Sequence, residues 1–298
     1  MKKTIKIPYD KNMKNFLNLL EIDFKIFVGD IGAAAIAEEP IYKDLVNLGY
    51  AHLYAFDGDK RQQANIKKQY NKNATIIDKF ILNGKDCTVY ICNEESGMTS
   101  LLKPSKKYLE FFNGFSEFGK VIETKTISTH SLDSVKEIER LDFLKMDIQG
   151  SELEVLRNGK KVINDIVAMQ LETPFVTLYE KQPTFGDIDT WMRKNGFLPH
   201  TFTDIKKWSI HPLTKDDNIR KPFNQLLEAD IIYIKDPTNF RNLSARQLKL
   251  LALFAIIFKS PDLLVNCVLN YEKIYKFKES EKKIEKILKE LNTILHKF

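Results

Sequence analysis

Three polar residues and a glycine follow a single apolar run near the middle of the chain, in the segment LDFLKMDIQGSELEVLRNG (residues 141–159). The run ends at Asp147, and Gln149, Gly150 and Glu152 come directly after it. A glycine at this position is typical of a sharp strand-to-helix turn. The pattern therefore predicts a buried strand that carries a carboxylate at its end.

A second apolar run, residues 166–171, ends at Glu172. Two carboxylates at the ends of neighbouring strands can act as a general base and its orienting group, or they can share a divalent cation that acidifies a hydroxyl. The sequence thus predicts Asp147 and Glu172 as catalytic residues. It permits a metal held by these two and Glu152 without requiring one, since Glu152 also suits the first turn of a helix.

The first apolar run of the chain ends in a turn of small residues. Asp30, Gly32, Ala33 and Ala34 follow it, and Asp57 closes the next run. In doubly wound sheets such a turn admits a ligand, and an acid after the second strand accepts ribose hydroxyls. The glycines that seat a pyrophosphate are missing, which favours a nucleoside cofactor without phosphates, such as S-adenosylmethionine, over NAD. Tight packing alone is the other reading of the turn.

Alternation of apolar runs with helical patterns predicts an α/β fold with a doubly wound, mostly parallel sheet. A hairpin is expected where the turn at residues 83–86 joins two runs. The predicted strands are 25–32, 51–59, 74–82, 88–92, 121–129, 141–147, 166–173, 197–204 and 229–236.

Three segments are expected along the chain. They are an N-terminal lead-in helix at 1–24, a catalytic domain at 25–236 and a helical extension at 237–298. The extension is apolar first and lysine-rich later, and its helices are expected to pack on the sheet or to form a homodimer rather than to dock on a membrane-associated assembly.

Bulk composition narrows the class of protein. The chain has 298 residues, a formal charge of +6 and three cysteines without zinc-site spacing. Neither a nucleic-acid-binding pattern nor a signal peptide is expected, and the longest apolar run, at 250–258, is too short to span a membrane. A cytoplasmic protein is the simplest expectation.

The segment LKMDIQGSELEVLRNG (144–159) resembles the signature of the FkbM-family methyltransferases. The segment 169–197 is also similar to that family, as are ESGMTSLLKPS (95–105), DIGAAAIAEEP (30–40) and YAFDGD (54–59). The turn departs from the family's Gly-Ala-Asn-x-Gly pattern, because its later glycine is Ile36 here.

The resemblance covers roughly residues 25 to 236. It implies a Rossmann-like methyltransferase sheet with one antiparallel strand near the C-terminus. It also implies O-methylation dependent on S-adenosylmethionine, often of sugar hydroxyls in glycans, lipids or secondary metabolites, as in polysaccharide biosynthesis. Asp30, Gly32, Ala33, Ala34 and Asp57 would then bind the cofactor, and Ser100 resembles a family loop residue that would also contact it.

Three residues beyond Glu172 are candidates for the acceptor wall, namely Thr173, Phe175 and Tyr179, because aromatic side chains stack on sugar faces. A binding or scaffold protein that keeps the fold without turnover is the main alternative. A Rossmann oxidoreductase is disfavoured by the missing pyrophosphate glycines.

Overall fold

A computed structural model of the chain describes residues 9–33, 39–56, 60–93 and 96–275, together with 282, 285–287 and 289–290. Side chains are described from residue 13 onward, except at 60–62.

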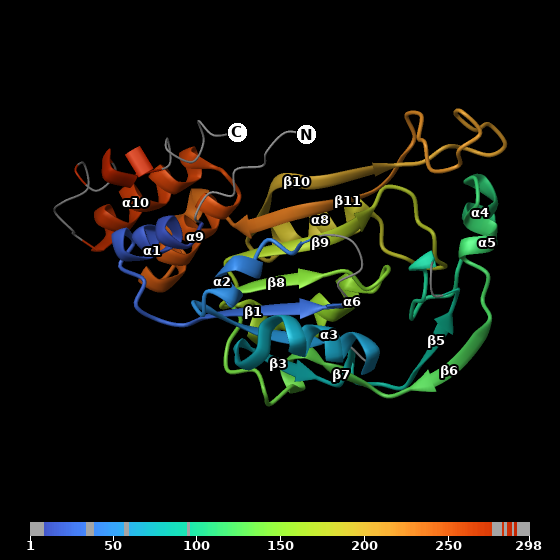
Figure 1. Cartoon of the computed structure of the whole chain (residues 1–298), viewed down its shortest axis with the longest axis horizontal. Helices are drawn as coiled ribbons and strands as arrows, with labels where there is room; N and C mark the ends of the chain where they lie inside the picture. The colour runs from blue at the N-terminus through green and yellow to red at the C-terminus, as the bar shows by residue number, and fades with distance from the viewer. Residues whose placement is uncertain are drawn as a thin grey trace.

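A seven-stranded sheet forms the centre of the molecule (Figure 1). Five of its strands run parallel, β11 is antiparallel to β9, and β10 is antiparallel to β11. The doubly wound fold class and its antiparallel strand are therefore confirmed. The strands in sheet order are β10 (Phe197–Lys207), β11 (Leu226–Lys235), β9 (Ala168–Pro174), β8 (Phe143–Met146), β1 (Ile26–Ile31), β2 (Ala51–Phe56) and β3 (Ala74–Ile77).

Helices cover both faces of this sheet, because successive strand residues point to opposite faces and both sides are apolar. One face packs against α1 (Tyr9–Leu19), α2 (Lys43–Asn47), α3 (Lys60–Tyr70), α9 (Ala245–Ile257) and α10 (Pro261–Tyr275). The other face packs against α6 (Glu152–Arg157), α7 (Lys160–Ile163) and α8 (Phe185–Lys194). Short 3-10 helices are Asn71–Asn73, Leu132–Ser134 and Pro237–Asn242.

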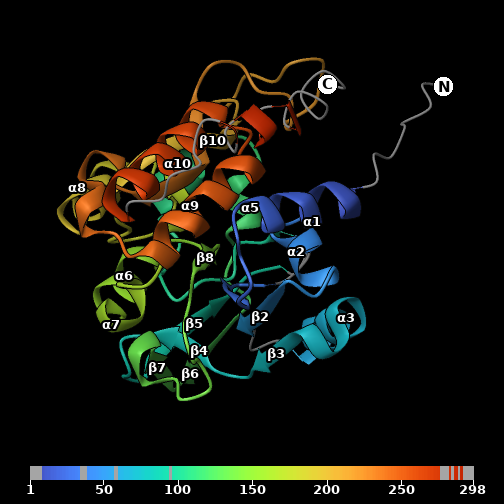
Figure 2. The same cartoon turned by 90° about the vertical axis from the view of Figure 1, so that its left-hand side faces the viewer.

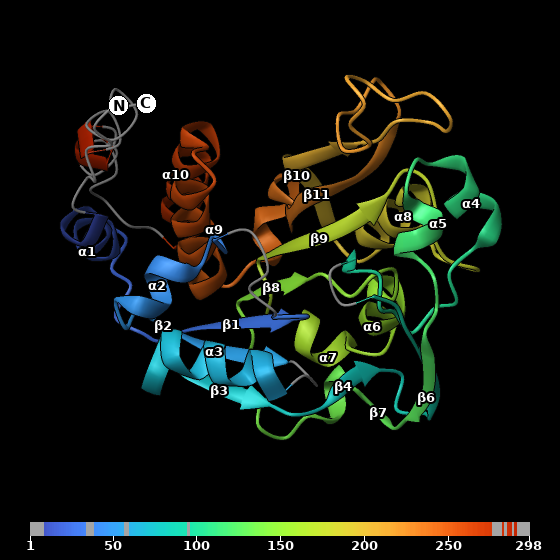
Figure 3. The same ribbon diagram turned by 45° about the vertical axis from the view of Figure 1, so that its right-hand side comes forward.

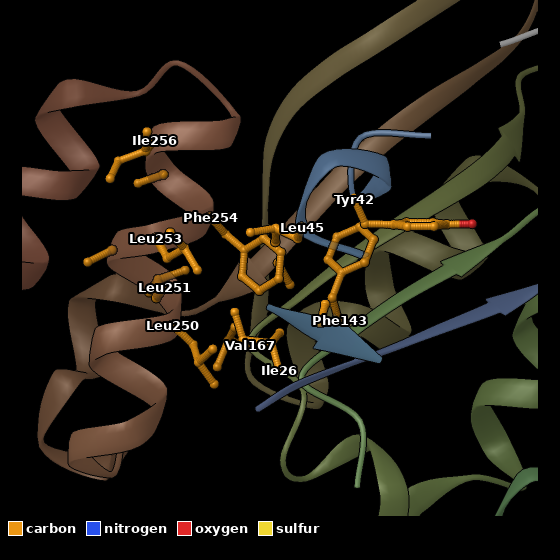
Figure 4. Packing of buried hydrophobic residues seen from close by; sticks show 14 of the residues in the cluster. Ile26, Tyr42, Leu45, Phe143, Val167, Leu250, Leu251, Leu253, Phe254 and Ile256 are labelled. Carbon is orange, nitrogen blue, oxygen red and sulfur yellow. The ribbon is translucent and has the colours of Figure 1, made fainter. Parts of the chain in front are cut away.

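The C-terminal helix α9 shares a core with the sheet (Figures 2 and 4). It is apolar on nearly all sides, as expected of a helix buried between a sheet and further helices. Phe254 stacks on Phe143 of β8, with ring centroids 5.1 Å apart. At the N-terminal side, Phe16 of α1 belongs to the same cluster. Packing on the sheet is thus observed for α9. The domain boundary expected at residue 236 stays a prediction.

The predicted hairpin is wrong. Its first run breaks into β3 and β4 (Phe80–Leu82), because the chain turns at Asp78 and Lys79. The short β4 pairs in parallel with β7 (Thr129–Ser131), and β5 (Cys87–Ile91) pairs with β6 (Glu123–Ile127). The alternation of apolar and polar residues predicted the strands, but their pairing depends on contacts between distant segments.

At one end of the molecule lie α4 (Lys106–Phe111) and α5 (Phe115–Phe118), next to the loop that joins β10 to β11 (Figure 3). This is the end to which the parallel strands point (Figure 1). The helices α1, α9 and α10 lie toward the opposite end.

A buried ion pair ties the C-terminal helices to the start of the sheet. Arg246 of α9 donates to Asp142 at 2.7 Å, and Asp142 accepts the Phe27 backbone N–H at 2.9 Å. The Asp142 side chain is almost fully buried, and burial raises its pKa against the opposing effect of Arg246. The guanidinium also lies 3.9 Å from the centre of the Phe24 ring.

We expect Arg246→Met to lower the free energy of unfolding by about 3 kcal/mol, because it leaves a buried carboxylate without its main cation. Urea denaturation measures this change. Arg241→Met, at an exposed position just before α9, is the matched control and should change stability by less than about 0.5 kcal/mol. Equal losses in the two variants would contradict the role of the pair.

Candidate active site

The order of the strands reverses between β1 and β8, since β2 and β3 lie on one side of β1 and β8, β9 and β11 on the other. Ligands of doubly wound sheets bind beyond the carboxyl ends of the strands at such a reversal. Gly32 follows β1, Asp147 follows β8, and the Asp147 backbone N–H donates to the Ile31 carbonyl at 3.1 Å. The predicted cofactor turn and the predicted catalytic loop therefore lie side by side.

Gly32 is required by this proximity. Its φ is +83°, and a Cβ placed on it would lie 2.0 Å from the Asp147 carbonyl oxygen. A side chain at this position would collide with the backbone of the loop that follows β8 at Asp147. The close contact at Gly32 is thus with the Asp147 carbonyl, as the tight-packing interpretation of the turn requires, and its approach to a ligand stays a prediction.

Asp30 lies in a buried polar network at the end of β1. The Tyr42 hydroxyl donates to its Oδ2, and Lys145 Nζ lies 3.8 Å from its Oδ1. Burial, and then the nearby Asp30, raise the pKa of Tyr42. Burial lowers the pKa of Lys145, but Asp30 and Asp147 outweigh it and the net shift is upward, so this lysine stays charged beneath the site.

The loop that follows β8 is bent by two consecutive residues with positive φ, Gln149 at +56° and Gly150 at +101°. A left-handed conformation costs a residue with a side chain roughly 1–2 kcal/mol. The buried Glu152 carboxylate offsets this cost by accepting the backbone N–H groups of Ile148 at 3.0 Å and Gly150 at 3.3 Å. The bend brings Gln149 back over the strand ends.

The Gln149 side chain joins the two predicted catalytic carboxylates. Its Nε2 donates to Asp147 Oδ1 at 3.1 Å and to Glu172 Oε2 at 3.0 Å. The Tyr179 hydroxyl donates to Gln149 Oε1 at 3.0 Å, which fixes the amide with its nitrogen toward the acids. One amide therefore sets the spacing of Asp147 and Glu172.

Ser100 holds the same loop from another side. Its hydroxyl donates to the Gln149 carbonyl at 2.7 Å and accepts the Leu102 backbone N–H at 3.0 Å. The side chain is almost fully buried. Ser100 therefore positions Gln149 in this structure.

Glu172 lies between like charges and a lysine. Lys206 of β10 donates to Glu172 at 3.1 Å and to Glu228 of β11 at 2.8 Å. Burial raises the pKa of Glu172 well above the usual range, Glu228 and Asp147 raise it further, and Lys206 lowers it. The protonation of Glu172 thus depends on Lys206.

The comparison with known families settles which one the chain represents. Residues 30–199 match the family described as "Methyltransferase FkbM domain", which is more than half of the chain. The chain belongs to the FkbM methyltransferase family. The match includes Asp30, Gly32, Asp147, Gln149 and Glu172, and it ends before most of β10.

Solved structures resemble this FkbM chain only distantly, and no curated protein sequence matches it. A precorrin-6y C5,15-methyltransferase from Geobacter metallireducens is 12% identical, with 79% of this chain and 92% of that chain covered and a TM-score of 0.35. A magnesium protoporphyrin IX methyltransferase from Synechocystis with bound SAM is 10% identical, with 76% and 80% covered and a TM-score of 0.34. Similarity this low supports no conclusion about function.

Two of the predicted cofactor residues of this FkbM chain, Ala34 and Asp57, lie outside the described residues. Ala33 is nearly buried, and its backbone N–H lies 3.5 Å from the Phe56 carbonyl oxygen at the end of β2. The described part of the turn therefore reaches across from β1 to β2, where the sequence places the cofactor.

The three candidates for the acceptor wall occupy different environments. Thr173 is fully buried, and its hydroxyl donates to the Ala229 carbonyl at 3.1 Å, so it contributes to the sheet. Phe175 is half-buried and packs against Phe185 and Phe202. Tyr179 is buried and orients Gln149. Of the three, Phe175 retains the exposure that contact with an acceptor needs.

A divalent cation does not fit between the acids as they stand. Gln149 Nε2 lies within hydrogen-bond distance of both Asp147 and Glu172, so the space between these carboxylates holds a donor and not a set of oxygen ligands. Among the described residues, no group of three or more His, Cys, Asp or Glu side chains is arranged to bind a metal.

Sequence reasoning missed the lysine that faces Glu172. Lys206 and Glu228 belong to the last two strands of the sheet, and Lys206 forms ion pairs with both Glu228 and Glu172. The antiparallel register pairs Glu228 with Pro174 and Lys206 with Glu228, and only that register reveals their proximity. Tyr42 was missed for a similar reason, because its partner Asp30 lies on another element.

The pH dependence of stability tests the burial of Glu152. Burial raises its pKa from 4.5 to about 7, so the folded protein binds more protons than the unfolded one between these values and its stability falls as pH rises through them. Glutamine cannot ionise, so the stability of Glu152→Gln should not fall in this way. We therefore expect its free energy of unfolding, relative to that of the wild type, to rise by up to about 3 kcal/mol between about pH 4 and about pH 8. Urea denaturation across this range measures the gain.

Glu152→Met is the control for lost hydrogen bonding. It should show the same pH trend as Glu152→Gln from a lower baseline, because methionine accepts no N–H from Ile148. A stability difference from wild type that is constant with pH would contradict the shifted pKa.

Proposed function

We propose that this FkbM-family protein is an O-methyltransferase that uses S-adenosylmethionine and methylates a sugar hydroxyl of a glycan, glycolipid or related metabolite. The observation that carries the proposal is the amide bridge between Asp147 and Glu172 at the reversal of strand order. A sugar hydroxyl is poorly acidic, so its methylation calls for a positioned base.

Asp147 is the base in this proposal because it is the more accessible of the two acids. Its Oδ1 accepts from Gln149, and the described residues give Oδ2 no hydrogen bond. Glu172, by contrast, is nearly buried, and its two oxygens accept from Gln149 and Lys206. Oδ2 of Asp147 would take the hydroxyl proton as the O–CH₃ bond forms and the S–CH₃ bond breaks.

Glu172 and Lys206 act as positioning residues. Glu172 holds the Gln149 amide, and Lys206 limits the negative charge that Glu172 and Glu228 build up beside the base. The cofactor supplies an electrophilic methyl group on a sulfonium cation, and a surplus of carboxylates near Asp147 suits a cation. Asp30, Gly32, Ala33, Ala34, Asp57 and Ser100 are proposed to hold or frame the cofactor.

Calorimetric titration with S-adenosylhomocysteine tests the cofactor assignment. We expect binding in the wild type and its loss in Asp57→Ala, which removes the carboxylate proposed to accept ribose hydroxyls. Absence of binding to the wild type would favour a scaffold protein without turnover.

Asp147→Asn tests the base. We expect it to keep S-adenosylhomocysteine affinity and fold while turnover falls at least about a hundredfold, because the amide cannot accept the proton. Turnover is measured as S-adenosylhomocysteine release with a panel of sugar acceptors. Asp133→Asn, at a half-buried position of the 3-10 helix Leu132–Ser134, is the control, and full activity in Asp147→Asn would rule out the assigned role.

Lys206→Met tests the electrostatic role of the lysine. Because Lys206 lowers the pKa of Glu172, its removal should raise that pKa and move the acidic limb of the pH–rate profile to higher pH. Activity lost near neutrality should return in part at alkaline pH. Lys207→Met, at the next and exposed position, should leave the profile in place, and an unshifted profile in Lys206→Met would contradict the coupling.

A further inference from the structure

The helices α4 and α5 and the β10–β11 loop lie at the end of the molecule that carries the proposed active site (Figures 1 and 3). We define the projecting lobe as residues 106–122, which include α4 and α5, together with residues 202–225, which form the end of β10 and the β10–β11 loop. Nine of the twelve exposed large hydrophobic side chains among the described residues belong to it. Single exposed apolar residues are ordinary, whereas a concentration of this kind marks an interaction surface.

The lobe is held in shape by hydrogen bonds. Asn113, between α4 and α5, donates to the carbonyls of Ile210 at 3.3 Å and Leu213 at 2.7 Å. In return the Trp208 indole donates to the Asn113 carbonyl at 2.8 Å. The two segments are thus tied together by one buried amide, and the apolar side chains are displayed by an ordered framework.

The exposed side chains sit at the tips of this framework. Leu213 is 65% exposed, Phe223 42% and Ile210 41%. All three also line a cavity of about 570 Å³, together with Trp208, His211, Asn224 and Gln225. Burying the three side chains in an apolar phase would be favourable, since each hydrophobic side chain contributes about 1.5–3 kcal/mol when fully buried.

Cations surround these apolar tips. Across the lobe there are eight lysines and arginines, at 106, 107, 120, 206, 207, 215, 220 and 221, and five acids, at 110, 117, 204, 216 and 217, which gives 8 − 5 = +3. Lys207 and Lys215 are exposed and form no ion pair with a carboxylate of the described residues. Positive charge beside exposed apolar side chains complements a surface that is negative outside and apolar within.

The residue composition of the lobe favours a lipid surface over a protein as its partner. Cores of protein interfaces are depleted in lysine, whereas surfaces that lie on anionic bilayers are enriched in it. Lys206 and Lys207 precede Trp208, and Arg220 and Lys221 follow Ile219. No helix of the described residues is long and apolar enough to cross a membrane, so any attachment by the lobe would be to the bilayer surface.

We propose that the projecting lobe docks the protein on an anionic lipid bilayer, with Leu213 and Phe223 entering the interface and Lys207 and Lys215 facing the headgroups. The lobe lies at the end of the sheet that holds Glu172, because Lys206 joins that carboxylate from the strand leading into it. The active site would then face an acceptor presented at the membrane. That consequence rests on the proposed function, whereas lipid binding does not.

Flotation of the full chain with vesicles tests the proposal without any measure of activity. The probes are vesicles of phosphatidylcholine alone and vesicles in which part of it is replaced by phosphatidylglycerol. We expect the wild type to float with the anionic vesicles and much less with the neutral ones, and added salt to weaken the binding.

Two variants separate the apolar and the charged contributions. Leu213→Ser combined with Phe223→Ser should weaken binding to anionic vesicles at least tenfold, because the inserted apolar area is lost. Lys207→Gln combined with Lys215→Gln should reduce the preference for anionic vesicles by about thirtyfold, given roughly 1 kcal/mol for each lysine near the surface.

The matched controls lie on α10, away from the lobe (Figure 3). Leu269→Ser and Lys273→Gln change an exposed leucine and an exposed lysine of that helix and should leave binding unchanged. Circular dichroism and urea denaturation check that each variant folds. Because these controls remove the same side-chain types, a general loss of apolar area or charge would affect them equally.

Three results would overturn the proposal. The first is a wild type that floats with neither kind of vesicle, and the second is binding that the lobe variants leave intact. The third is a wild type that does not bind vesicles but sediments as a dimer, with the dimer lost in the Leu213→Ser and Phe223→Ser double variant. That result would make the lobe an interface between two copies of the chain. Absence of S-adenosylhomocysteine binding would count against the proposed function and not against lipid docking.

Discussion

The hydrogen bonds of one amide hold the proposed catalytic residues together. Gln149 donates to both Asp147 and Glu172 because the Tyr179 hydroxyl donates to its side-chain oxygen and so orients the amide. The bend of the loop, with its two positive φ angles, brings the amide into reach of both acids. Two ionised carboxylates that share one hydrogen-bond donor group repel each other, and the two N–H groups of the amide offset this repulsion by donating one hydrogen bond to each acid. The buried Glu152 and Ser100 stabilise the same bend through hydrogen bonds to the loop backbone, while the Gln149 side chain itself bonds to Asp147, Glu172 and Tyr179.

Charge balance around this amide depends on parts of the chain that are far apart in sequence. Lys145 enters from β8 beneath the site, and Lys206 enters from β10 beside it. Both remain charged because carboxylates surround them. The antiparallel strands at the end of the sheet therefore contribute to the candidate site as well as to the core, since removing them would take away the lysine that forms an ion pair with Glu172.

Sequence patterns predicted what is local and what the family repeats. The strand that ends at Asp147 and the glycine turn after β1 were visible in the chain, because apolar runs and their polar ends are properties of single segments. The antiparallel strand was expected from the resemblance to the FkbM family. The pairing of β5 with β6 and the pairing of Lys206 with Glu172 depend on contacts between distant segments, and no short pattern encodes those. The bridging role of Gln149 could not be predicted from the sequence, because it requires both the bend of its own loop and the position of Tyr179.

The segment that matches the family is smaller than the part of the chain that builds and covers the sheet. It ends at residue 199, so it includes β9 but not β11, seven residues of which pair in an antiparallel ladder with β9. A fragment cut at the limits of the match would expose that edge as an unpaired hydrogen-bonding surface, which favours aggregation. It would also lack Phe254, whose ring covers Phe143. Limits drawn from sequence similarity therefore mark what the family has in common, and a cooperative domain of this chain has to be taken from its packing.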